Sequence, residues 1–92
     1  MNIFLNKKIL IYGLGKSGLS AFRFLKNKSD VFLYDDYQLK IKNLDIKKKT
    51  INYKNIFKST FDVIILSPGI DINKCKLSKF LKKNNSKIYS DL

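Results

Sequence analysis

Ninety-two residues, 45% of them apolar, are enough for one domain with a single sheet and its covering helices. This length excludes a complete two-substrate ligase or dehydrogenase within residues 1–92. The sequence has no apolar stretch near the roughly 20 residues of a membrane span, and its start lacks the order of a signal peptide. A single cysteine, Cys75, excludes a disulfide framework. We therefore expect one domain covering residues 1–92, a reducing, cytoplasmic setting and no membrane partner.

The formal net charge of +12 raises the alternative of a nucleic-acid-binding module, because lysines attract any polyphosphate. Arg23 is the only arginine, although arginine is the usual reader of phosphates and base edges. The lysines are spread through every segment, and Lys, Asn and Ile share AT-rich codons. A biased base composition therefore explains the charge, and we expect no nucleic-acid partner.

In chain order, short apolar runs bounded by turn residues predict about five strands: 7–12, 31–34, 50–53, 62–66 and 87–89. The segment 50–53 lies within residues 38–60, where the residue pattern indicates secondary structure least clearly. A helix is predicted from Ser17, with an apolar face of Gly18, Ala21, Phe22 and Leu25, and a second helix over 75–84, with Leu77, Phe80 and Leu81. Alternating strands and helices predict an α/β fold, a Rossmann-like, mostly parallel sheet with helices on both faces.

The first predicted strand runs directly into a G-x-G-x-x-G motif at the start of the first helix. Glycine allows a tight turn at Gly13, the approach of an anion at Gly15 and close packing of helix on strand at Gly18. The start of the helix offers unpaired N–H groups and the positive end of its dipole. Three neighbouring glycines often mean only a tight turn, but this position between strand and helix favours a phosphate site. The predicted residues are Gly13, Leu14, Gly15, Lys16, Ser17 and Gly18.

Two carboxylates, Asp35 and Asp36, end the second predicted strand, and Asp35 comes 17 residues after Gly18. In dinucleotide enzymes an acidic residue near this place binds the adenosine ribose. A carboxylate can equally accept the imide N–H of uracil. Either aspartate can also act only as a turn cap at the strand end. We favour a binding role for Asp35 and leave both interpretations of Asp36 open.

A second glycine corner, Ser67-Pro68-Gly69, ends the strand that we expect beside the first one. Ligands of such sheets bind beyond the carboxyl ends of the strands, where the strand order reverses. A Pro-Gly corner there would bring bare backbone close to a ligand. Pro-Gly is also one of the commonest turn dipeptides, so the corner alone decides nothing.

Three elements in this order resemble the N-terminal domain of the UDP-N-acetylmuramoyl-L-alanine:D-glutamate ligases, the MurD family. They are Gly13-Leu14-Gly15-Lys16-Ser17-Gly18-Leu19-Ser20, Asp35-Asp36 and Leu66-Ser67-Pro68-Gly69-Ile70. The similarity runs from about Lys7 to the last residue. The Ser-Pro-Gly-Ile element separates this family from generic NAD-binding domains. Many members carry a small hydroxyl residue and an arginine where this chain has Asp36 and Tyr37.

The resemblance implies that the domain binds the UDP half of UDP-MurNAc-L-alanine. It implies that Lys16 and Ser17 meet the diphosphate, that Asp35, Asp36 and Tyr37 surround the uracil, and that Ser67, Pro68 and Gly69 close over the base. Tyr37 can stack on a base or lie as a half-buried loop aromatic.

The family's reaction is ATP-dependent amide formation through an acyl phosphate, in peptidoglycan synthesis. The sequence contains no Walker-type P-loop, no His and no Glu. We therefore expect residues 1–92 to bind substrate without catalysis, with no catalytic residue, metal ligand or cofactor of their own. ATP, Mg²⁺ and the central and C-terminal domains are expected in the full-length enzyme. An NAD-binding Rossmann domain of a regulatory protein or a dehydrogenase is the alternative.

Overall fold

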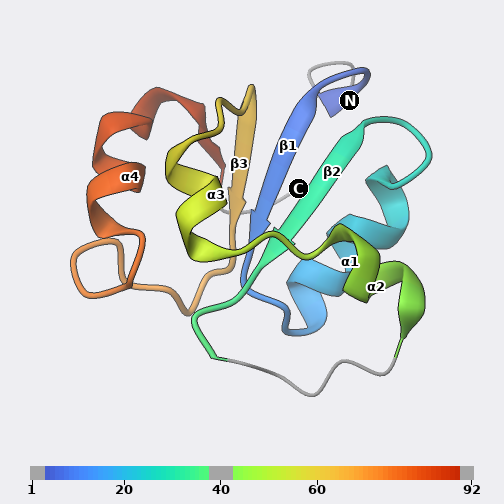
Figure 1. The fold of residues 1–92 in the computed structure, drawn as a ribbon, viewed down its shortest axis with the longest axis horizontal. Helices are drawn as coiled ribbons and strands as arrows, with labels where there is room; N and C mark the ends of the chain where they lie inside the picture. The colour runs from blue at the N-terminus through green and yellow to red at the C-terminus, as the bar shows by residue number, and fades with distance from the viewer. Residues whose placement is uncertain (1–3, 38–42, 90–92) are drawn as a thin grey trace.

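The computed structural model describes residues 4–37 and 43–89 (Figure 1). The strands in these residues are β1 (Lys8–Tyr12), β2 (Asp30–Tyr34), β3 (Val63–Leu66) and β4 (Ile88–Tyr89). The α-helices are α1 (Lys16–Leu25), α2 (Leu44–Lys49), α3 (Tyr53–Phe57) and α4 (Ser78–Lys83), and a short 3₁₀ helix covers Asn85–Lys87.

The strands form one parallel sheet in the order β2-β1-β3-β4. Ile9 of β1 lies opposite Val31 of β2 on one side and Val63 of β3 on the other. The chain first moves outward from β1 to β2 and then crosses to the opposite side of β1. The strand order therefore reverses between β1 and β3, and their carboxyl ends flank the place where such sheets bind ligands.

The α/β fold and parallel sheet confirm the predicted fold class, but the described sheet has four strands and the predicted strand 50–53 is wrong. Thr50 forms only an isolated parallel bridge with Leu33, and the Ile51 N–H donates to the Leu33 carbonyl over 2.9 Å. The next residue, Asn52, caps α3 by accepting the Asn55 N–H over 2.9 Å. Because the cap turns the chain into a helix, the pairing with β2 ends after one bridge.

Helices cover both faces of the sheet, as predicted. Alternate residues of β1 point to opposite faces, so Ile9 and Ile11 lie in one core and Leu10 and Tyr12 in the other. The first core includes the buried face of α1, with Ile46 of α2 packed against it. The second core includes buried residues of α3 and α4. Strands buried on both faces explain the unbroken apolar runs in the sequence.

The apolar face predicted for the first helix is confirmed, since the buried residues of α1 are Gly18, Ala21, Phe22 and Leu25. The second predicted helix is shorter than 75–84. The Lys74 and Cys75 N–H groups both donate to the Asp71 carbonyl, which forms a turn ahead of α4. The predicted apolar face still holds, because Leu77, Phe80 and Leu81 are buried.

Candidate nucleotide site

The turn between β1 and α1 is shaped by two glycines that no larger residue could replace without strain. Gly13 has φ +103°, a conformation that L side chains rarely adopt, and its N–H donates to the Tyr34 carbonyl over 2.8 Å. A Cβ on Gly18 would lie 1.8 Å from the Gly13 carbonyl oxygen. The predicted packing role of Gly18 therefore has a specific partner, the backbone of Gly13.

The start of α1 is open. Gly15 is the N-cap residue, and no side chain caps the helix there. A Cβ on Gly15 would meet nothing within 4 Å, and Lys16 and Ser17 are exposed. The first N–H groups of any helix lack intrahelical partners and lie at the positive end of its dipole. This end of α1 can therefore hold an anion, and Lys16 adds a cation beside it.

The carboxylate of Asp35 fastens the glycine turn to the end of β2. Its Oδ2 accepts the Leu14 N–H over 2.8 Å, and its Oδ1 accepts the Tyr37 N–H over 2.9 Å. The residue thus performs the turn-capping role that the sequence left open as an alternative. Each carboxylate oxygen has a further lone pair, so Asp35 can still accept a ligand donor.

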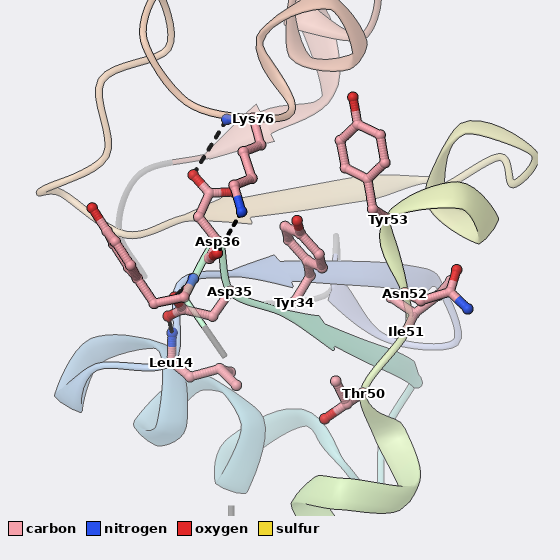
Figure 2. A pocket seen from close by; sticks show the side chains of 10 residues that line it. Leu14, Tyr34, Asp35, Asp36, Thr50, Ile51, Asn52, Tyr53 and Lys76 are labelled. Carbon is pink, nitrogen blue, oxygen red and sulfur yellow. Dashed lines mark hydrogen bonds between the residues drawn. The ribbon is translucent and has the colours of Figure 1, made fainter. Parts of the chain in front are cut away.

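Asp36 links β1 to the loop before α4. Its Oδ1 accepts the Tyr12 hydroxyl over 2.5 Å. Its Oδ2 accepts the Lys76 N–H over 3.3 Å, and Figure 2 shows this bond to Lys76. The Lys76 Nζ donates to the Asp36 carbonyl oxygen over 3.1 Å. Both carboxylate oxygens of Asp36 are therefore engaged by protein donors, and this residue holds two loops together at the carboxyl edge of the sheet.

The environment of these aspartates keeps the neighbouring phenols protonated. Burial raises the pKa of Tyr12 well above its ordinary value, and the hydrogen bond to Asp36 raises it further. Burial also raises the pKa of Tyr34, with a second contribution from the negative charge of Asp36. Tyr12 therefore remains a hydrogen-bond donor to Asp36 at any physiological pH.

The Ser67-Pro68-Gly69 corner follows β3, which lies beside β1 as predicted. The Ser67 N–H donates to the Tyr12 carbonyl over 3.0 Å, and its hydroxyl donates to the Gly13 carbonyl over 3.3 Å. Ser67 thus braces the glycine turn from the β3 side. Pro68 and Gly69 are exposed.

A pocket of about 800 Å³ opens beyond the carboxyl end of β2 (Figure 2). Four of its lining residues are predicted site residues: Leu14, Asp35, Asp36 and Tyr37. Gly15, Lys16 and Ser17 follow Leu14 directly but do not line the pocket, and neither do Ser67, Pro68 and Gly69. The structure thus brings Leu14 and the three residues predicted to surround a base together in one cavity, and it leaves the Ser67-Pro68-Gly69 corner outside that cavity.

Sequence analysis missed the other lining residues, which are Tyr34, Thr50, Ile51, Asn52, Tyr53 and Lys76. A signal existed for part of this set. The expected strand 50–53, placed in parallel beside β2, would bring its own residues to the edge where β2 ends at Asp35. Lys76 is 40 residues from its partner Asp36 and carried no comparable signal.

Two further observations concern only residues 4–37 and 43–89. No helix in these ranges is long and apolar enough to cross a membrane. The same residues contain no group of three or more potential metal-binding side chains.

Comparison with known proteins places the chain in a family. Residues 7–89 match the family model described as Mur ligase MurD-like, N-terminal domain. The chain is similar to the UDP-N-acetylmuramoylalanine–D-glutamate ligase of Rickettsia felis, with 35% identity over all of this chain and 21% of the relative. The ligase of the same name from Rickettsia prowazekii is 38% identical over 78% of this chain and 17% of the relative.

A relative from Lachnoclostridium phytofermentans carries the same name. It is 39% identical over 73% of this chain and 17% of its own length. No solved structure gives a significant match to the chain. The chain spans about a fifth of the length of these curated relatives. With residues 7–89 matched, the chain belongs to the family of MurD-like N-terminal domains of Mur ligases.

Proposed function

We propose that this domain binds the UDP part of UDP-MurNAc-L-alanine, for a ligase that adds D-glutamate in peptidoglycan synthesis. One observation carries the proposal. In this MurD-like N-terminal domain, Gly15 at the uncapped start of α1 directly follows Leu14, and Leu14 lines the same pocket as Asp35 and Asp36. A nucleoside diphosphate needs an anion site and a base site joined by a ribose, and the two features supply that pair.

The diphosphate is assigned to the start of α1. Gly15 leaves the backbone N–H groups accessible, Lys16 supplies a positive charge and Ser17 a hydroxyl donor. Gly13 and Gly18 contribute indirectly, because their close contact sets the path of the turn. Leu14 joins the two halves, since it lines the pocket and precedes Gly15.

The base is assigned to the pocket beside Asp35, Asp36 and Tyr37. Asp35 has acceptor capacity left for the uracil imide after its two backbone contacts. Asp36 holds Tyr12 and the backbone of Lys76 in position, and its oxygens, like those of Asp35, each keep a further lone pair for a ligand donor. Tyr37 is 78% exposed at the rim of the pocket, where its ring can lie over a ligand.

The corner of Ser67, Pro68 and Gly69 is assigned to the β3 side of the same ligand. Ser67 holds the glycine turn through the Gly13 carbonyl, and the exposed Pro68 and Gly69 offer a surface that closes over the ligand. The family match favours this assignment over the NAD-binding alternative.

The rest of the reaction is assigned to parts of the protein outside residues 1–92. ATP, Mg²⁺ and the groups that form the amide bond would come from central and C-terminal domains, so residues 1–92 bind substrate and catalyse nothing. The free thiol of Cys75 fits a reducing, cytoplasmic location.

Isothermal titration of the chain with UDP and with NAD⁺ tests the proposal. UDP should bind more tightly, and Gly15→Val should abolish measurable binding because its branched side chain enters the open space at the start of α1. Valine is also a poor N-cap, which costs about 1 kcal/mol of stability. Ser20→Val, at an exposed position on the same helix, is the matched control and should keep UDP affinity. Full UDP affinity in Gly15→Val, or tighter binding of NAD⁺, would overturn the proposal.

A further inference from the structure

The wall of the pocket opposite Asp35 is aromatic and apolar, and it comes from residues that the UDP assignment above does not use. Tyr34 ends β2 and is 8% exposed, and Tyr53 begins α3 and is 44% exposed. Ile51 lies between them along the chain and packs against the second core. Figure 2 shows Ile51 and Tyr53 on the side of the pocket away from Asp35, with the Tyr34 ring between them and Asp35.

This wall is held in place by specific contacts. The Ile51 N–H donates to the Leu33 carbonyl over 2.9 Å, which fastens the segment to β2. Asn52 caps α3 and so sets the direction in which Tyr53 leaves the backbone. The Tyr53 ring packs on Phe57 at 5.0 Å between centroids, and Phe57 packs on Phe80 at 5.7 Å. Tyr53 is therefore a surface aromatic anchored to the core, with one side left to the pocket.

An exposed, anchored aromatic ring beside polar acceptors suits a planar heterocycle. Bases stack on aromatic side chains through their π-faces, while hydrogen bonds at their edges give selectivity. Asp35 supplies the edge acceptor on one wall, and Tyr53 and Ile51 supply an apolar surface on the other. Leu14 lines the same cavity and leads into the anion site at α1, so a ring here can share one ligand with a diphosphate there.

We propose that Tyr53 is a base-stacking residue of the UDP site, and that the base ring lies in the pocket between Asp35 and the segment 50–53. This inference rests on the proposed function and adds a second wall to the base site. Tyr53 gives affinity for the ring, while Asp35 gives selectivity for a base with an imide donor.

Phe57 offers a matched control, because it is 43% exposed, lies on the same helix and does not line the pocket. Tyr53→Leu and Phe57→Leu both remove the Tyr53–Phe57 pair, and Phe57→Leu also removes the Phe57–Phe80 pair, so Phe57→Leu should disturb α3 at least as much as Tyr53→Leu. Only Tyr53→Leu should weaken UDP binding, by about fivefold to tenfold, since an aromatic pair contributes about that factor. Tyr53→Phe keeps the ring and should bind UDP within about twofold of the unsubstituted chain.

Inorganic pyrophosphate, which has no base, separates the two halves of the site. Its affinity, measured by direct titration of each variant, should be unchanged in Tyr53→Leu and lost in Gly15→Val. NMR provides a readout without substitution, since the uracil H5 and H6 protons should show nuclear Overhauser contacts to the Tyr53 ring.

The outcomes distinguish the stacking role of Tyr53 from the proposed binding of UDP. UDP binding that is unchanged in Tyr53→Leu, with no contact from Tyr53 to the uracil protons, overturns the stacking role and leaves the UDP proposal standing. Equal losses in Tyr53→Leu and Phe57→Leu also overturn it, because the effect is then structural. If the chain binds UDP no more tightly than pyrophosphate, the base pocket is overturned altogether. If the chain binds neither ligand, the proposed function is overturned.

Discussion

The glycine turn and the pocket beside it share Leu14, yet they are assembled in different ways. The turn and α1 come from one continuous segment, in which Gly18 packs against the Gly13 carbonyl, and Asp35 and Ser67 brace that turn from the neighbouring strands. The pocket draws on residue 14 and on the separate segments 34–37, 50–53 and 76. Its hydrogen bonds join residues 21 and 40 positions apart.

The difference predicts how each region responds to substitution. In the turn, a single added Cβ displaces the backbone, and no other part of the chain can take over the role of that backbone. In the pocket, each hydrogen bond between segments is one of several, so a single substitution should cost less stability. It should change ligand affinity by shifting the position of a loop.

Gly18→Ala should destabilise the fold most. Alanine is the better helix former by about 1 kcal/mol. Its Cβ, however, would lie 1.8 Å from the Gly13 carbonyl oxygen, so α1 must move away from the turn. We expect a net loss of about 3 kcal/mol in the free energy of unfolding, measured by urea denaturation.

Gly15→Ala is the control for this prediction, because a Cβ there meets nothing within 4 Å and the residue has φ −76°. It should change stability by less than about 1 kcal/mol. Similar losses in the two variants would show that α1 does not pack on the turn as closely as the structure indicates.

Asp35→Ala tests whether the pocket is built by long-range contacts. The variant removes an acceptor from the Leu14 and Tyr37 N–H groups, so it should lose about 1–2 kcal/mol of stability. UDP affinity should fall by about tenfold, because the imide acceptor and the turn geometry are both lost.

Asp62→Ala is the matched control, because the Asp62 carboxylate accepts the Lys8 N–H over 2.9 Å near the opposite end of the sheet. It removes the same charge and a similar hydrogen bond, far from the pocket. It should lower stability by about 1 kcal/mol and leave UDP affinity unchanged. Parallel losses of UDP affinity in both variants would indicate a general effect of charge.

Tyr12→Phe should have the smallest effect, and one that depends on pH. The raised pKa of Tyr12 in the folded state means that its contribution is complete below pH 10 and is lost as the pH rises above 10. Unfolding by urea at pH 8 and pH 11 should show the unsubstituted chain losing about 1 kcal/mol more than Tyr12→Phe between the two values. Equal losses would mean that Tyr12 ionises as easily in the folded as in the unfolded chain.

Local sequence was sufficient for the features in which neighbouring residues decide the conformation. The strand 8–12, the glycine turn and the buried face of α1 were all predictable, because strand burial, helical periodicity and glycine conformations act over a few residues. The segment 50–53 was predicted wrongly for a local reason too. Its β-branched residues favour a strand, but the side chain of Asn52 caps a helix and ends the pairing.

The sequence by itself therefore determined the α/β class, the glycine turn and the placement of Asp35 at a strand end. Only the tertiary structure decided that Asp36 is held by Tyr12 and Lys76, and that Tyr53 lies across a pocket from Asp35. The physical reason is the parallel sheet. It gathers the carboxyl ends of strands at one edge, but which loops meet there depends on the packing of short helices between them, and that packing leaves no pattern in any single segment.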